Sequence, residues 1–595
     1  MTFRFSPFSR CFRGVGCGFV FSIIVASQGQ AASDNNSGLL SQASPAGTAV
    51  IGKRYLNFPI SDTGKVYQTT VLIDGTELGT FSIALASEKP DWWAFIDVAQ
   101  FKGKTLEVKV KDAAAQQPVF LQADEIPGTE DLYHEKFRPQ IHFTSRRGWL
   151  NDPNGLVYYK GRYHLFYQHN PMGLLSDNVS WGHAVSPDLF HWKELPGLLF
   201  PNSQTGQSWT GAAIIDTKNQ LGLKKGADDT MLAFYLRTRS GLSYAYSTDG
   251  GITFNNYTAN PVVTHPGDRI DSPKPIWYAP GKYWVAAVFD HNARPDDPSG
   301  QCYTVAFYKS QDLKTWKKTG DIGRASFLAE CPDLFPLPVD GDKRNQKWVL
   351  ILSDGCYIVG SFDGKMMRNE SGTPAKIGDI QTALSAGGDY YATMSWSNIP
   401  ASDGRRIQIA WMNDNAKPYG DNHFNEQMSL PMELSLYKTD LGAKLRMYPV
   451  RELDGLRGRE YSWSNVPLTT GTNPLAGIQT GDAALDVEAE LKVSDAAKLE
   501  FSLRGFHVSY DASGDTLICS GPKGLRARLV SHDGVVRLRM IVDRFSIEVF
   551  GNEGEIYVPM LAANSQPDQS LSLNLRQGKC IIKGMHVYEL KSVWP

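Results

Sequence analysis

The feature that most constrains the fold of this chain is a pattern of short, aromatic-rich strands that recurs between residues 138 and 450. The phrases that carry it are GLVYYKGRYHLFY, DDTMLAFYL, KPIWYAPGKYWVAAVF, QKWVLILS and RRIQIAWM. Turn-forming residues such as those at 248–251 and 362–364 separate strands, and no long stretch has helical periodicity. Repeated β-meanders over such a length favour a β-propeller over a β-sandwich. We therefore expect an all-β protein whose central domain, residues 138–454, is a propeller.

Strand patterns of a different kind flank this central domain. Alternating apolar and polar residues with Gly and Asp-Gly turns predict a small β-sandwich at 49–114, in which the tryptophans of Asp91-Trp92-Trp93 fit core positions better than a platform for carbohydrate. Longer alternating strands predict a larger β-sandwich at 455–595. The composition of 32–48, rich in Ser, Ala, Gly and Asn, is typical of a flexible leader, and 115–137 reads as a linker.

The N-terminus has the parts of a secretory signal peptide. Three arginines precede an apolar run at 15–26, and the small residues up to Ala31 fit a cleavage site. The run is shorter than the roughly 20 residues that span a bilayer, so a membrane anchor fits less well. Residues 1–31 are therefore predicted to be removed. The mature protein is expected to be soluble, with no membrane contact, and secreted or periplasmic.

Charge and cysteine content argue against two further classes of protein. The chain has 60 Lys and Arg against 62 Asp and Glu, a formal net charge of −2, so no global field draws in nucleic acid. Beyond the signal region the cysteines are few and odd in number, and none forms a Cys-x-x-Cys pair. Mostly free, buried thiols are expected, in place of a disulfide framework or a zinc site. These cysteines are Cys302, Cys331, Cys356, Cys519 and Cys580.

Two acidic residues stand out by their neighbours. Asp152 lies in WLNDPNG, a turn-forming cluster that can present a carboxylate at a strand end among aromatic residues. Rings stack on sugar faces and acids act on the glycosidic bond, so this mixture suits carbohydrate; the alternative is an Asp that only caps a turn. Glu330, in AECPDLFPLP, has the apolar neighbours that suit a general acid. A surface Glu is the alternative there, and Asp333 is a competing candidate.

A third acidic residue, Asp271, lies in DRIDSPKPIWY close to Arg269 and Lys274. These cations favour the ionised form of a carboxylate, which is useful beside a developing oxocarbenium ion. Taken alone, a structural salt bridge explains the same residues better.

Several motifs together resemble a known enzyme family. WLNDPNG, YQHNP, WGHAVSPDLFHW, WTGAA, AECPDLF, GDYYA and RRIQIAWM occur in that order, and VDRFSIEVFG follows near the C-terminus. In these motifs, over residues 138–595, the chain resembles glycoside hydrolase family 32, the β-fructosidases. The resemblance implies a five-bladed β-propeller followed by a β-sandwich. It also implies a retaining mechanism in which a fructosyl group becomes covalently attached to the enzyme.

The resemblance assigns roles to individual residues. The family nucleophile falls on Asp152 and the acid/base on Glu330; retention requires the two carboxyls to lie about 5–5.5 Å apart. Two carboxylates suffice for this chemistry, so no cofactor and no metal are expected. The substrate-binding residues implied by the family are Asn151, Gln168, Trp181 and Trp209, and Trp149 and Arg269 are further candidates.

One departure from the family pattern concerns the third carboxylate. The family has Arg-Asp-Pro, whereas this chain has Arg269-Ile270-Asp271-Ser272-Pro273. Alignment on the proline puts Ser272 where the acid should be, and alignment on the acid puts Asp271 there. Asp271 is favoured as the transition-state stabiliser because a site for fructose hydroxyls needs a carboxylate nearby.

The function expected from these features is secreted hydrolysis of terminal β-D-fructofuranosyl residues from levan, inulin or sucrose by a monomer. The N-terminal sandwich resembles domains that precede some bacterial levan-active members of the family, which favours levan. A fructosyltransferase or an endo-levanase on the same scaffold is the alternative. A non-catalytic fructan-binding protein is a remote one, because both Asp152 and Glu330 are present.

Overall fold

The fold is described by a computed structural model in which strands and short 3₁₀ helices make up the regular structure. The predicted signal peptide, residues 1–31, lies outside the described residues. Among the described helices, none has the length and apolar character that a membrane crossing requires. The described residues are 43–45, 47–112, 119–264, 269–291, 303–325, 328–382, 388–413, 422–520, 524–562 and 570–595.

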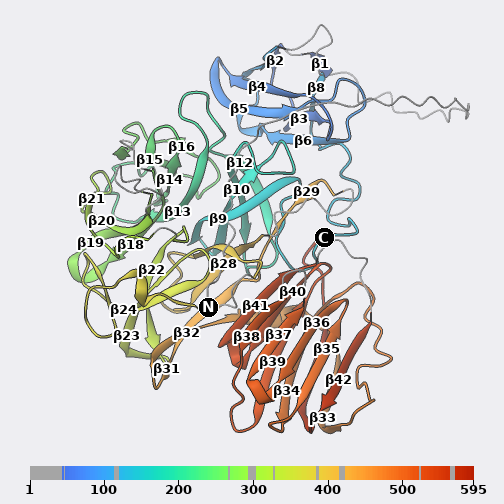
Figure 1. The fold of residues 1–595 in the computed structure, drawn as a ribbon. Coiled ribbons are helices and arrows are strands. Elements are labelled where there is room, and N and C mark those ends of the chain that lie inside the picture. The colour runs from blue at the N-terminus through green and yellow to red at the C-terminus, as the bar shows by residue number, and fades with distance from the viewer. Residues whose placement is uncertain are drawn as a thin grey trace, which may run out of the picture. The chain divides into compact units, whose positions relative to one another are not determined.

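The central domain is a β-propeller of five blades, as the sequence predicts (Figure 1). Each blade is an antiparallel meander of four strands, and a parallel pair between β22 and β31 joins blades IV and V. Blade I holds β9 (Gly148–Tyr159), β10 (Arg162–Asn170), β11 (Ser180–Ser186) and β12 (Lys193–Leu198); blade II holds β13 (Ser208–Asp216), β14 (Thr230–Arg237), β15 (Gly241–Ser247) and β16 (Asn255–Asn256); blade III holds β18 (Arg269–Tyr278), β19 (Tyr283–His291), β20 (Tyr303–Ser310) and β21 (Lys317–Asp321); blade IV holds β22 (Asp333–Val339), β23 (Asp342–Ile351), β24 (Cys356–Phe362) and β25 (Met367–Asn369); blade V holds β27 (Tyr391–Ser395), β28 (Arg406–Met412), β31 (Met432–Thr439) and β32 (Gly442–Pro449).

The first strand of each blade forms the inner ring of the propeller. β9 contacts β13, β13 contacts β18, β18 contacts β22, and β27 returns to β9. A short strand, β29 (Phe424–Asn425), closes the ring by pairing in parallel with β9. Four short pieces complete the edges: β17 (Val263–Thr264), β26 (Gln381–Thr382), β30 (Gln427–Met428) and the 3₁₀ helix η4 (Ile377–Asp379). The starts of the inner strands therefore meet at one end of the ring, and this end carries the candidate site.

The N-terminal domain is a sandwich of two four-stranded sheets, with orders β1-β8-β3-β6 and β2-β7-β4-β5. Trp92 is 3% exposed and belongs to its core, as predicted, whereas Trp93 is only half-buried. The strands are β1 (Ala43–Pro45), β2 (Thr48–Val50), β3 (Tyr55–Ile60), β4 (Val66–Ile73), β5 (Thr76–Ala84), β6 (Trp92–Asp97), β7 (Thr105–Val110) and β8 (Val119–Ala123), and the 3₁₀ helix η2 spans Ala99–Phe101.

Two predicted boundaries of this domain are wrong. β1 and β2 begin inside the expected leader, 32–48, and β8 lies inside the expected linker, 115–137. β8 pairs with β3, and β1 in turn pairs with β8, so these short segments are stabilised by the sheet. Short strands that depend on a distant partner carry too little alternation of their own to be recognised in the sequence.

The C-terminal domain is a sandwich of a six-stranded and a five-stranded sheet with a continuous apolar core. It follows the 3₁₀ helix η5 (Arg451–Leu456), close to the predicted boundary at 455. One sheet holds β33 (Arg457–Leu468), β34 (Ala484–Val493), β39 (Val535–Val542), β40 (Ser546–Gly551), β41 (Ile556–Leu561) and β43 (Cys580–Leu590); the other holds β35 (Lys498–Leu503), β36 (Phe506–Asp511), β37 (Thr516–Ser520), β38 (Leu525–Arg528) and β42 (Leu571–Gln577). Short 3₁₀ helices span Ala512–Gly514 and Asn552–Gly554 in this domain, and another, Ala279–Gly281, lies between β18 and β19 of the propeller.

The cysteines within the described residues form no disulfide with one another, as expected: Cys331, Cys356, Cys519 and Cys580. Three of them are buried and Cys356 is half-buried. Cys302 lies outside the described residues.

Candidate active site

Asp152 lies inside strand β9, where the sequence predicts a turn. The WLNDPNG motif is extended throughout, and its ladder with β10 shifts register on both sides of Phe166 and Tyr167. Gly155 lies in this irregular part with a φ of +55°, and a Cβ there would come within 2.5 Å of the Phe166 ring. Glycine adopts a positive φ readily and has no Cβ to clash with the ring, so it suits this position. The expected turn is therefore wrong, because the turn-forming residues of the motif serve a bulged strand.

The carboxylate of Asp152 is buried and held by neutral donors. It is 5% exposed, and its Oδ2 accepts hydrogen bonds from Thr210 Oγ1 at 2.5 Å and Gln168 Nε2 at 3.2 Å. Among the described residues, no Lys, Arg or His forms an ion pair with it. Burial raises the pKa of Asp152 to about 6; the Thr210 hydrogen bond lowers it, and the negative charge of Asp271 raises it. A carboxylate with this pKa changes its charge in a range where catalysis can use it.

The register of β18 shows how the strand accommodates the segment around Asp271. Asp271 pairs with Phe289 and Lys274 with Ala287, so strand β18 carries one extra residue between these pairs. That residue is part of a β-bulge in which Ser272 adopts a left-handed φ of 50°. Its Oγ donates a hydrogen bond of 3.0 Å to Asp271 Oδ1. The bulge absorbs the insertion, and Asp271, which is 2% exposed, is the residue whose charge acts on Asp152.

Glu330 is half-buried and lies in the bend just before β22. Its carbonyl accepts a hydrogen bond of 2.9 Å from the backbone N–H of Ser353. The next residue, Cys331, is fully buried with a left-handed φ of 50°, and its Sγ lies 3.9 Å from Asp152 Oδ2 and 3.6 Å from Ser272 Oγ. Two residues in a conformation that costs about 1–2 kcal/mol each therefore touch beside the three carboxylates, which is typical of a functional site.

Asp333, the competitor of Glu330, is held by structural partners. It is 1% exposed, and its Oδ2 accepts hydrogen bonds from Ser395 N at 2.9 Å and Ser395 Oγ at 2.6 Å. Lys274 Nζ lies 3.7 Å from the same oxygen. Its charge is thus compensated within the propeller.

The other predicted substrate residues divide into groups. Asn151 begins the motif on β9, and its Oδ1 is buried without a partner. Gln168 bonds Asp152 as described, and Trp209 is half-buried with its Nε1 bonded to Gln207 Oε1 at 3.3 Å. Trp149 is 5% exposed and packs edge-on against another ring, that of Trp411. The side chain of Arg269, at the first position of β18, lies outside the described residues.

Trp181 lies in the core of the propeller. It is fully buried, packs against Phe166 and Tyr235, and donates from Nε1 to the carbonyl of Trp209 at 3.1 Å. A ring with no exposed face has no surface on which a sugar can stack. Trp181 therefore supports the backbone of Trp209 from the core, and the expected contact with substrate is wrong.

Three residues of the site were missed by sequence reasoning. Thr210 donates to Asp152, and the hydroxyl of Tyr391 has its pKa raised by burial and by the charge of Glu330. Trp411 pairs with Tyr391 across the β27–β28 ladder, and its Nε1 is buried without a partner, so it has a free donor for a ligand. All three lie in motifs that mark the family resemblance, WTGAA, GDYYA and RRIQIAWM. Membership of these motifs was the sequence signal that could have identified them as site residues.

The arrangement defines a class of protein. A propeller brings together the buried carboxylate of Asp152, which forms no ion pair with a described cation, two further acidic residues, unpaired amide and indole groups, and aromatic rings, which is the equipment of an enzyme that cleaves glycosidic bonds. Within the described residues, no cluster of His, Cys, Asp and Glu has the makeup of a metal site.

Comparison with known proteins identifies the family. Residues 142–449 match the model of the glycosyl hydrolases family 32 N-terminal domain, and residues 452–560 match that of the family 32 C-terminal domain. The chain therefore belongs to glycoside hydrolase family 32, and it is a glycoside hydrolase that acts on β-fructosides.

Individual relatives agree with this assignment. A levanase of Bacillus subtilis (strain 168) is 35% identical over 502 residues, which cover 78% of this chain and 72% of the relative. An extracellular exo-inulinase of Aspergillus awamori is 28% identical over 532 residues, covering 78% of this chain and 96% of the relative. A crystal structure of exo-inulinase from the same fungus superimposes with a TM-score of 0.65 at 25% identity and covers 78% of this chain and all of that one.

Proposed function

We propose that the protein is a secreted, retaining exo-β-fructosidase that releases fructose from fructans, with levan as the favoured substrate. The observation that carries the proposal is that the two acidic motifs meet in the fold. Asp152 is buried among neutral donors, and Cys331, the neighbour of Glu330 in the chain, touches Asp152. The levanase and exo-inulinase relatives support fructan as the substrate class, and the exo-inulinase, an extracellular enzyme, supports an extracellular location. The preference for levan rests on the N-terminal sandwich.

In the first chemical step, an Asp152 oxygen attacks the anomeric carbon of the terminal fructosyl group. The bond from that carbon to the glycosidic oxygen breaks, and Glu330 gives its proton to the leaving oxygen. A covalent ester between the fructosyl group and Asp152 results. The carboxylate of Asp271 lies on the same site and stabilises the oxocarbenium character of the transition state.

In the second step, Glu330 takes a proton from water, whose oxygen attacks the same carbon. The ester bond to Asp152 breaks, and fructose leaves with its anomeric configuration retained. Asp152 must be ionised to attack, so a pKa of about 6 keeps the enzyme active from neutral pH down to mild acid. Asn151 and Trp411 supply polar groups for sugar hydroxyls.

The distorted Arg-Asp-Pro motif was the reason to consider fructosyl transfer. The bulge at Ser272 absorbs the extra residue and leaves Asp271 near enough for its charge to act on Asp152. The distorted motif is therefore a weaker argument for transfer, and hydrolysis is favoured. Transfer and endo-cleavage remain the alternatives that the products must separate.

The test is incubation with levan, inulin and sucrose followed by analysis of early and late sugar products. We expect free fructose from the first time point, faster from levan than from inulin. Oligosaccharides as the first products would instead indicate endo-cleavage, and difructose anhydride or longer chains would indicate transfer. Absence of any product with a folded protein would contradict an enzymatic role.

A further inference from the structure

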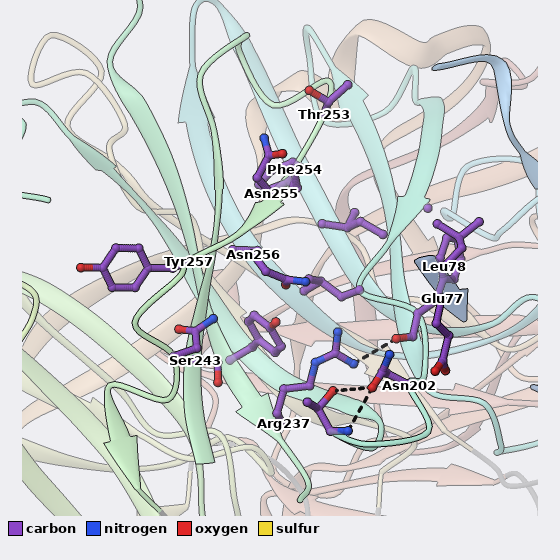
Figure 2. Close-up of a pocket in the computed structure, with 18 of the residues that line it drawn as sticks. Glu77, Leu78, Asn202, Arg237, Ser243, Thr253, Phe254, Asn255, Asn256 and Tyr257 are labelled. Carbon is purple, nitrogen blue, oxygen red and sulfur yellow. Dashed lines mark hydrogen bonds between the residues drawn. The ribbon is translucent and has the colours of Figure 1, made fainter. Parts of the chain in front are cut away.

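A second hollow lies away from the carboxylates, between the N-terminal sandwich and blades I and II of the propeller (Figure 2). We call it the sandwich groove. Its volume is about 670 Å³, within the range of about 300–1,000 Å³ typical of ligand sites. One wall is formed by Glu77 and Leu78 of β5, and the opposite wall by residues 252–257, which include β16 (Figure 2).

The groove offers unpaired amide groups to a ligand. The side chains of Gln204, Asn255 and Asn256 line it, are exposed, and form no hydrogen bond with other described residues. Apolar rings lie beside them, with Phe254 half-buried on the blade II wall and Phe200 at the end of blade I. Amides next to ring faces bind the hydroxyls and the apolar faces of sugars.

The charged groups in the lining are already engaged. Glu77 accepts hydrogen bonds from Ser203 N at 2.8 Å, Ser203 Oγ at 2.6 Å and Thr80 Oγ1 at 2.8 Å. Arg237 donates from Nη1 to the carbonyls of Phe200 and Gly206 at 3.0 and 3.1 Å. Both side chains already have hydrogen-bond partners inside the protein, and the charge of Arg237 acts on that of Glu77, so the groove fits a neutral, hydroxyl-rich ligand better than an ion.

The sandwich wall of the groove is fixed to blade I. Ser82 N donates to Asn178 Oδ1 at 2.7 Å, and Asn178 Nδ2 returns a bond of 2.8 Å to the Ser82 carbonyl. The rings of Phe81 and Phe200 pack edge to face with centroids 5.7 Å apart. A wall that is already fixed loses little conformational freedom when the groove binds a ligand.

The groove is also linked to the catalytic strand. Arg237, in its lining, pairs directly with Ser208 at the start of β13. Two residues further along β13, Thr210 donates to the nucleophile candidate Asp152. Between them, Trp209 bonds Gln207, whose N–H donates to Thr238 Oγ1 at 3.1 Å. A long neutral chain with its end at Asp152 thus has the groove as a neighbouring site.

We propose that the sandwich groove is a second binding site for a fructan chain, which holds sugar units remote from the unit cleaved at Asp152. This proposal rests on the proposed function for the identity of the sugar. It gives the N-terminal sandwich a role, since β5 supplies one wall. The groove raises affinity for polymers because two sites on one chain act together.

The test is the triple variant Gln204→Ala, Asn255→Ala, Asn256→Ala, with Gln577→Ala as the matched control. Gln577 is also an exposed, unpaired amide, but it lies on the C-terminal sandwich. We expect the KM for levan to rise about tenfold, from three lost hydrogen bonds, while kcat for levan and kcat/KM for sucrose stay unchanged. The control is expected to match the wild type in every parameter.

Two results would overturn the proposal: an unchanged KM for levan in the triple variant, or an equal loss on levan and sucrose, which would mark a general disturbance of the active site. A binding experiment separates this proposal from the proposed function. In the Asp152→Asn background, the triple variant is expected to lose retardation in gels that contain levan, whereas the single variant keeps it. If the wild type hydrolyses no fructan, the proposed function fails. Retardation in levan gels still shows whether the groove binds fructan.

Discussion

The active centre and the interface between propeller and C-terminal sandwich both bury carboxylates, but among the described residues Asp543 and Glu548 at the interface pair with a histidine, whereas Asp152 at the active centre pairs with no cation. At the interface, His142 Nδ1 lies 2.8 Å from Asp543 Oδ2 and its Nε2 lies 2.9 Å from Glu548 Oε1, with all three side chains fully buried. Tyr557 and the N–H of Leu430 also donate to Glu548. At the active centre, the described groups that donate to the Asp152 carboxylate are neutral, and Asp271 adds a like charge.

The difference is visible in the direction of the pKa shifts. Burial raises the pKa of Asp152 to about 6. Burial also acts to raise that of Asp543, but the His142 hydrogen bond and charge outweigh it, and the pKa of Asp543 is lowered. A buried carboxylate with a cation stabilises the fold, whereas one without a cation keeps its charge available for chemistry at a cost in stability. The predictions that follow test this division of labour.

The largest effect is expected from Asp152→Asn. Loss of the nucleophile should reduce kcat on levan or sucrose by about 10⁴-fold or more. The folded state keeps the proton of Asp152 up to about pH 6 and the unfolded chain only to about 3.8, so the ionised group destabilises the fold at neutral pH. The variant should therefore unfold at a temperature equal to or above that of the wild type at pH 7. Preserved turnover would refute the assignment.

The matched change at the interface, Asp543→Asn, is expected to do the reverse. It leaves His142 with one carboxylate and weakens four hydrogen bonds, including those from the N–H groups of Gln140 and Ile141. Breaking a buried ion pair costs roughly 3–5 kcal/mol, which urea unfolding can measure. Activity per folded molecule should stay near the wild-type value. A loss of activity without a loss of stability would contradict the comparison.

The contribution of the interface to the stability of the fold should also be lost at alkaline pH. Burial alone would lower the pKa of His142, but the hydrogen bonds and charges of Asp543 and Glu548 raise it to about 9, above its ordinary 6.5. Protonated His142 therefore makes its full contribution to the free energy of unfolding below about pH 6.5, and this contribution is lost as the pH rises through 9. Thermal unfolding between pH 6 and 10 should show this decline, and His142→Gln should remove much of it. A His142→Gln curve parallel to that of the wild type would refute the charged histidine.

A smaller effect is expected from Thr210→Val. The Thr210 hydroxyl stabilises the ionised form of Asp152, so its loss should raise the pKa of Asp152 above about 6. The acidic limb of the kcat/KM profile on sucrose, which reports the free enzyme, should move to higher pH. Thr210→Ser keeps the hydroxyl and should keep the limb in place. An equal shift in both variants would point to packing rather than to the hydrogen bond.

Much of the architecture and the acidic residues of the site could be predicted from sequence, because strand repeats and specific motifs are local signals. Side-chain burial was harder. Trp181 and Trp209 stand in similar motifs, but only the fold decides that one ring is enclosed by Phe166 and Tyr235. Thr210 was missed because its partner Asp152 is 58 residues away in the chain. Strand β8 was missed because its partner β3 is equally remote.

The most direct test of the central claim, that Asp152, which forms no ion pair with a described cation, makes the nucleophilic attack, is to trap the covalent intermediate. In Glu330→Gln, a substrate with a good leaving group, such as β-fructofuranosyl fluoride, needs no acid for the first step but lacks the base for the second. After a denaturing quench, mass spectrometry should find one added fructosyl group, on the peptide that contains Asp152. A fructosyl group on another residue, or continued turnover with inverted configuration and no adduct, would contradict the account.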